Sequence, residues 1–128
     1  LYSIVSTCNF FIENIEKVQS KLTSDAEKEE LERRLGDVYF ARALAYAELI
    51  RFYCEAYDED IADKEEMGVS LKLSYADASP VKRSTLRESY AQVISDLEFA
   101  EKYIPSSRSV ADSPYFSIGA VNALRSRI

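Results

Sequence analysis

The fold of this chain is decided by LGDVYFARALAY, residues 35–46, in which one arginine, Arg42, stands among mostly apolar residues. Successive residues of an α-helix are rotated by about 100°, so the charged residues of nearby turns can be placed around the same helix. Glu30, Asp37 and Glu48 fall on the side opposite Arg42. Arg42 therefore faces the apolar side of the helix, where the rest of the protein must pack.

Apolar residues also recur at spacings of three and four in the flanking segments, which is typical of amphipathic helices. The expected helices cover residues 2–22, 25–57, 86–104 and 117–128. Residues 58–83 break the periodicity and are expected to form a long connection, and a shorter loop is expected at residues 106–116. We predict an all-α fold of about four helices in two antiparallel pairs, with the long loop between the pairs.

Polar residues at the predicted helix starts form capping patterns. Ser24 with Glu27 and Thr85 with Glu88 have the spacing of a capping box, in which each side chain accepts a hydrogen bond from the other residue's backbone N–H. Ser117 can cap the last helix. These residues place the helix starts independently of the apolar spacing.

Composition excludes several classes of function. A net charge of −6 without a clustered basic face disfavours nucleic acid and anionic membranes as partners. The absence of histidine removes the commonest general base and metal ligand. Helical spacing would place Cys8 and Cys54 about 20 Å apart, so both are expected to be buried free thiols.

The acidic residues are expected to be solvated rather than catalytic or metal-binding. Charged residues alternate in sign over residues 27–34, as on a salt-bridged helix face. The acidic run at residues 58–66 lacks the glycine and the ligand spacing of an EF-hand, so calcium binding is the less favoured alternative. No metal site and no cofactor are predicted.

Arg42 carries the sharpest prediction, because a charge among apolar side chains must be paired. Asp96, next to Leu97 on the packing side of the third helix, is the expected partner. Arg127 of the fourth helix can share the carboxylate of Asp96. We expect a structural role for this group and regard ligand contact as the less favoured alternative.

The chain has nine tyrosines, and aromatic rings can stack on sugars. Six of them lie at helical packing positions and are expected in the core: Tyr39, Tyr46, Tyr53, Tyr57, Tyr90 and Tyr103. Tyr75 is the one aromatic residue of the loop 58–83, which makes it the candidate for ligand contact. The favoured alternative for Tyr75 is that it anchors the loop on the domain.

The helix around Arg42 resembles the signature G-E-A-x-F-L-R-A-L-x-Y-x-x-L-x-x-x-Y-G of the SusD-like (RagB/SusD) family of Bacteroidetes. The matching residues are Gly36, Phe40, Arg42, Ala43, Leu44, Tyr46, Leu49 and Tyr53, with Cys54 in place of the final glycine. Further segments match family patterns in the same order: Cys8-Asn9 with Ile12, Gly68 to Leu71, Pro80 to Leu86, Tyr90 to Ala100, and Ala123 to Ile128. The order of the segments makes the resemblance specific.

This resemblance implies that residues 1–128 are a single helical, tetratricopeptide-like part of a larger protein, at its N-terminal end. Proteins of this family are nutrient-binding lipoproteins, anchored by lipid at the outer membrane and exposed on the cell surface. They bind an oligosaccharide or other nutrient, without enzymatic activity, for uptake through a SusC-like TonB-dependent transporter. The resemblance therefore places the export signal and lipidated cysteine before Leu1, and assigns the helices a scaffold role.

Two other functions stay open from the residues alone. Leu35, Gly36 and Tyr39 fit the first helix of a tetratricopeptide repeat, so the chain could be a free-standing protein–protein interaction module. Strict 34-residue self-similarity is absent. A helical hydrolase would need two carboxylates facing each other in a pocket.

Overall fold

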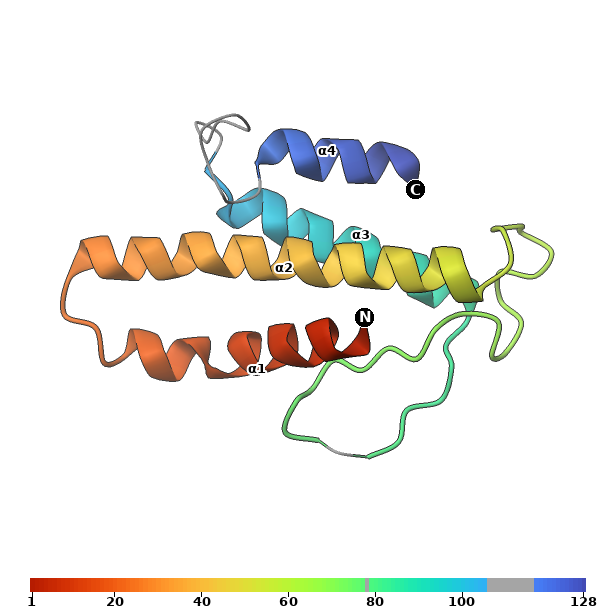
Figure 1. Ribbon diagram of the computed structural model, residues 1–128, viewed down its shortest axis with the longest axis horizontal. Coiled ribbons are helices and arrows are strands. Elements are labelled where there is room, and N and C mark those ends of the chain that lie inside the picture. The colour runs from red at the N-terminus through yellow and green to blue at the C-terminus, as the bar shows by residue number, and fades with distance from the viewer. Residues whose placement is uncertain (78, 106–116) are drawn as a thin grey trace.

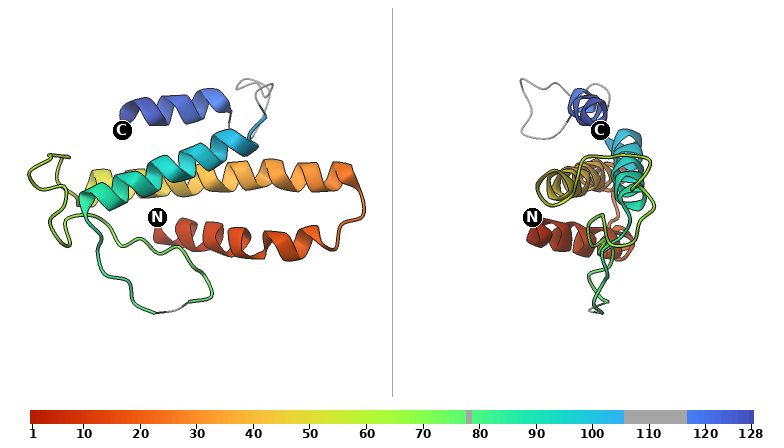
Figure 2. Two further views of the ribbon diagram at one scale, coloured as in Figure 1. Left: turned by 180° about the vertical axis from the view of Figure 1, so that it is seen from behind. Right: turned by 90° about the vertical axis from the view of Figure 1, so that its right-hand side faces the viewer.

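The computed structural model describes residues 1–77, 79–105 and 117–128 and confirms the predicted all-α fold of two helical hairpins (Figure 1). Its helices are α1 (Tyr2–Gln19), α2 (Asp25–Tyr53), α3 (Leu86–Tyr103) and α4 (Ile118–Arg127). The helices α1 and α2 lie antiparallel, α3 packs along another side of α2, and α4 lies on α3 (Figures 1 and 2). The predicted loop at residues 106–116 lies outside the described residues.

The long helix α2 is the centre of the core, because it packs against both α1 and α3. Ala43, Tyr46 and Leu49 of α2 are buried. They pack against one face of α3, on which apolar residues recur at spacings of four and three. The same cluster includes Val5 of α1, Val93, Leu97 and Ala100 of α3, and Val121 and Leu124 of α4. Each large side chain buried in this way stabilises the fold by roughly 1.5–3 kcal/mol.

Gly36 allows the close approach of α2 to the end of α3. A Cβ atom at this position would lie 2.9 Å from the backbone nitrogen of Ile104, closer than a carbon atom can normally come. The glycine of the signature pattern is therefore explained by helix packing.

The helices α1 and α2 are shorter than their apolar patterns predict. Cys54 is extended, with φ −118° and ψ 158°, so α2 ends at Tyr53. The prediction of core positions for Tyr53 and Tyr57 is wrong: both are exposed, Tyr53 by 72%. Neighbouring helices cover only part of the circumference of α2 at this end. Tyr46 is buried, and the remaining three predicted core tyrosines, Tyr39, Tyr90 and Tyr103, are half-buried.

The long connection between the hairpins, predicted for residues 58–83, begins after Tyr53 and ends before Leu86. Its two arms meet where the backbone N–H of Gly68 donates to Ser84 O (2.7 Å) and that of Ser84 donates to Val69 O (2.9 Å). Cys54, at its start, is a half-buried free thiol, and Cys8 is a buried one. None of the described helices is long and apolar enough to cross a membrane.

Two of the three predicted caps are present. Thr85 Oγ1 accepts from Glu88 N–H (3.1 Å), Glu88 Oε1 accepts from Thr85 N–H (3.2 Å), and Ser117 caps α4. The prediction of a capping box at Ser24 is wrong, because the side chain of Ser24 makes no cap hydrogen bond. The first turn of α2 is exposed to solvent, so water can satisfy its N–H groups.

We expect Thr85→Ala to lower the free energy of unfolding by about 1 kcal/mol, because the first turn of α3 loses its side-chain acceptor. Ser24→Ala is the matched control and should leave stability nearly unchanged. Urea denaturation followed by circular dichroism measures both. Equal losses for the two variants would contradict the assignment of the caps.

Candidate functional site

Arg42 and Asp96 form a buried ion pair between α2 and α3. Arg42 Nε donates to Asp96 Oδ2 at 2.9 Å, and Arg42 Nη2 donates to Asp96 Oδ1 at 2.7 Å. Only 6% of Arg42 and none of Asp96 is exposed. Two parallel charge-assisted hydrogen bonds of this kind fix both distance and orientation, so the pair holds the two helices in register.

Two amide side chains complete what we call the polar node, formed by Arg42, Asp96, Asn9 and Gln92. Arg42 Nη1 donates to Asn9 Oδ1 at 2.9 Å, which joins α1 to the pair. Gln92 Nε2 donates to Asp96 Oδ1 at 3.1 Å. The node therefore connects three helices through polar groups that partner one another, of which Asn9, Arg42 and Asp96 are buried.

Burial and pairing act in opposite directions on the two charges of the node. Burial alone would lower the pKa of Arg42, but the hydrogen bonds and the negative charge of Asp96 raise it above its ordinary value. Burial raises the pKa of Asp96, and the hydrogen bonds from Arg42 and Gln92 oppose that shift. Each charge is tolerated in the core because the other is present.

Arg127 is not part of the node, which corrects the expectation that it shares Asp96. Its Nη2 lies 3.6 Å from Glu48 Oε1, and 60% of its side chain is exposed. Arg127 is the last residue of α4, and it pairs there with Glu48 of α2 rather than with Asp96 of α3. The charge of Arg127 stays at the surface and keeps its contact with water, so it does not need a buried partner.

The node extends to the long loop through a backbone carbonyl. Asn9 Nδ2 donates to Lys72 O at 2.8 Å, and the hydroxyl of Tyr46 donates to the same oxygen. Sequence analysis missed Asn9 as a site residue, although it belongs to the Cys8-Asn9 pattern and is a polar residue beside an apolar seam. The loop segment that follows Lys72 is thus tied to the core.

Tyr75 lies on this tied segment and is exposed. Its ring meets the ring of Phe10 of α1 edge to face, with the centroids 5.0 Å apart. Below it, Glu13 accepts hydrogen bonds from the backbone N–H groups of Tyr75 (2.8 Å) and Ala76 (3.1 Å). The structure thus places Tyr75 against α1, about 60 residues earlier in the chain, as the alternative in which Tyr75 anchors the loop on the domain predicts.

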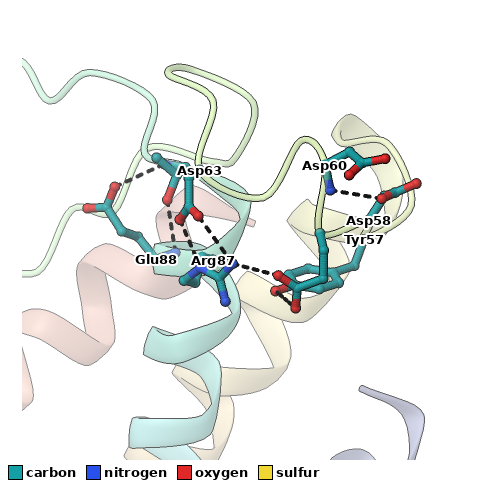
Figure 3. Close-up of polar contacts among 8 residues, drawn as sticks. Tyr57, Asp58, Asp60, Asp63, Arg87 and Glu88 are labelled. Carbon is teal, nitrogen blue, oxygen red and sulfur yellow. Dashed lines mark hydrogen bonds and ion pairs between the residues drawn. The ribbon is translucent and has the colours of Figure 1, made fainter.

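Part of the acidic run is paired rather than merely solvated. Arg87, in the first turn of α3, donates to Asp63 Oδ1 at 2.8 Å (Figure 3). It also donates to Glu59 Oε2 at 2.7 Å. Tyr57 donates its hydroxyl hydrogen to Glu59, and Arg87 N–H donates to Ala62 O. In the described part of the chain, no group of three or more acidic or sulfur side chains is arranged to hold a metal ion.

This acidic cluster makes the loop sensitive to pH. The hydrogen bonds from Arg87 lower the pKa values of Glu59 and Asp63 below their ordinary range. Because a lowered pKa favours the folded state above the ordinary pKa, the cluster stabilises the loop near neutral pH and loses this effect as pH falls through the lowered values. We expect NMR titration to show that Arg87→Gln raises both pKa values toward the ordinary range. Unchanged values would contradict the pairing.

Comparison with known proteins agrees with this arrangement. A family model described as SusD-like, starch-binding and associating with the outer membrane matches residues 1–128. A SusD superfamily protein from Bacteroides thetaiotaomicron is 27% identical, with a TM-score of 0.77, over 98% of this chain and 26% of that chain. A putative sugar binding protein from Bacteroides vulgatus is 24% identical, with a TM-score of 0.81, over 98% of this chain and 27% of the other.

A laminarin binding SusD-like protein has the same fold, with a TM-score of 0.68 and 19% identity over 98% of this chain and 24% of the other. No curated protein sequence matches the chain. The chain spans 24–27% of the length of these three solved proteins. Because the family model covers all 128 residues and the helices superpose on solved members, the chain belongs to the SusD-like family.

Proposed function

We propose that residues 1–128 are one helical part of a larger SusD-like protein that captures a glycan at the cell surface. The protein passes the glycan to a SusC-like TonB-dependent transporter and is held at the outer membrane by a lipid anchor outside this part. The observation that carries the proposal is the match of the whole chain to a family described as starch-binding and associated with the outer membrane. The names of the sugar-binding and laminarin-binding relatives support the same ligand class.

The geometry supports different roles for the buried ion pair and for the exposed loop. Arg42 and Asp96 are buried, so they act as scaffold and are out of reach of a ligand. The loop that the node ties down carries Tyr75, which is exposed. Ligand contact in this part of the protein is therefore expected from the loop and its neighbours on α1.

The hydrogen bonds of Glu13 make it unsuited to act as the general acid of a glycosidase. With Glu16 and Glu32, it lines a groove between α1 and α2 where a pair of carboxylates could in principle act on a sugar. The hydrogen bond from the Ser74 hydroxyl lowers the pKa of Glu13. A general acid for glycoside cleavage needs a raised pKa, whereas Glu13 accepts three hydrogen bonds from the loop and holds it in place.

The proposal is tested with the full-length protein and two probes, soluble starch and laminarin, by isothermal titration calorimetry. We expect binding of at least one glycan without release of reducing ends. Release of reducing ends would favour the hydrolase. Failure to bind any glycan, together with binding of a peptide, would favour the free-standing interaction module.

A further inference from the structure

Phe10 and Tyr75 form an exposed aromatic corner. Their rings meet edge to face at 5.0 Å, yet 50% of Phe10 and 53% of Tyr75 remain accessible to water. Neither ring belongs to the hydrophobic core cluster. Large aromatic side chains stabilise a fold mainly through burial, so half-exposed rings in contact with each other contribute less to the fold than buried ones.

A dedicated set of hydrogen bonds holds this corner in place. Glu13 accepts from the backbone N–H groups of Tyr75 and Ala76 and from the hydroxyl of Ser74, at 2.8, 3.1 and 2.5 Å. Ser74 Oγ in turn accepts from Asp77 N–H at 3.2 Å. One carboxylate thus fixes three consecutive residues around Tyr75. We call this set the Glu13 clamp.

A second anchor lies on the other side of Tyr75. Lys72 O accepts from Asn9 Nδ2 at 2.8 Å and from Tyr46, so the loop is also tied to the buried polar node. Phe10 lies between Asn9 and Glu13 on the turns of α1 that supply both anchors. The two rings are therefore placed before any ligand arrives, and such preorganisation lowers the entropic cost of binding.

The chemistry of the corner fits a neutral sugar ring. The face of an aromatic ring is electron-rich and accepts weakly positive C–H groups, which a pyranose presents on its flatter face. Asn14, one turn after Phe10, carries an amide that is fixed by a hydrogen bond from its Nδ2 to Phe10 O at 2.8 Å. Binding sites for small ligands typically combine an apolar surface with a few fixed polar groups of this kind.

We infer that Phe10 and Tyr75, whose rings stand at 76° to each other, form a platform that binds a pyranose, one ring against the face of the sugar and the other against its edge, and that Glu13 is the positioning residue that holds the platform. This inference rests on the proposed glycan-binding function and names residues that carry it. Phe10 is added here to Tyr75, and the Glu13 clamp explains why a loop residue can offer a fixed surface.

The test uses calorimetry of the full-length protein with soluble starch and laminarin. Phe10→Ala and Tyr75→Ala should each weaken glycan binding about tenfold or more, whereas Tyr75→Phe should bind nearly as well as the wild type because the ring remains. Phe52→Ala is the matched control, since Phe52 is an exposed aromatic residue on α2. It should bind like the wild type.

Glu13 requires readouts that separate positioning from stability. Glu13→Ala should weaken binding without lowering the melting temperature, because its carboxylate holds only the exposed loop. Hydrogen exchange should become faster at the amides of Tyr75 and Ala76. Glu13→Gln, which keeps one acceptor oxygen, should restore part of the affinity. A loss of affinity that appears only together with a lower melting temperature would overturn the positioning role.

The outcomes distinguish this inference from the proposed function. If the wild type binds a glycan and Phe10→Ala and Tyr75→Ala bind equally well, the platform is wrong and the glycan-binding function stands. If the wild type binds neither probe, both the function and the platform are refuted for these glycans.

Discussion

Asp96→Asn is expected to lower the free energy of unfolding by about 3–5 kcal/mol, because it leaves the Arg42 guanidinium buried without a counter-charge. The ion pair has no exposed route to water, since Asp96 is fully buried and Arg42 nearly so. Arg42→Met should be similarly destabilising, because the carboxylate is then the uncompensated charge. Urea denaturation followed by circular dichroism measures both variants.

A double variant tests whether the loss of stability comes from the unpaired charge that each single variant leaves. Arg42→Met combined with Asp96→Leu removes both charges, and apolar replacements of a buried pair are often neutral. We expect the double variant to be more stable than either single one. Arg33→Gln, which removes only exposed ion pairs to Glu29 and Glu30, is the surface control and should change little. An unchanged melting temperature in Asp96→Asn beside a strong loss in Arg42→Met would show that Asp96 is not the essential partner.

Gly68→Ala should lower the free energy of unfolding by about 1–3 kcal/mol, because the added methyl group overpacks a site that is already filled. An added Cβ would overlap the hydroxyl of Ser89 and the backbone carbonyl of Thr85, at the start of α3. The backbone of Thr85 cannot move away without breaking its capping box. Gly68 has no positive φ, so the close approach, and not a left-handed turn, requires the glycine.

The effect of Gly68→Ala should include the loop that Gly68 closes. Its N–H donates to Ser84 O and its carbonyl accepts from Arg83 Nε at 2.8 Å, so displacement of Gly68 separates the two arms. Faster hydrogen exchange across residues 68–84 would report this separation. Gly119→Ala in the exposed first turn of α4 is the control and should be neutral or slightly stabilising. Equal behaviour of the two variants would contradict the packing argument.

Local sequence signals predicted the helices well and their details less well. The apolar spacing located all four helices, but it predicted that α2 continues beyond Tyr53. The spacing shows which residues are apolar, but it does not show whether a neighbouring helix covers them. The capping pattern was correct at Thr85 and wrong at Ser24, although both have the same spacing. The difference is tertiary: the start of α3 is packed against the loop at Gly68, whereas the start of α2 lies in water.

The amino-acid sequence alone specifies that Arg42 faces the core and needs a buried acidic partner, because helical periodicity and the cost of an unpaired charge are local arguments. It indicates Asp96 by the same periodicity. The positions of Asn9, Glu13 and Phe10 around the loop of Tyr75 depend on the path of a non-periodic segment that meets α1 some 60 residues after it. That path depends on backbone hydrogen bonds to side chains far apart in the chain, so only the tertiary structure brings these residues together.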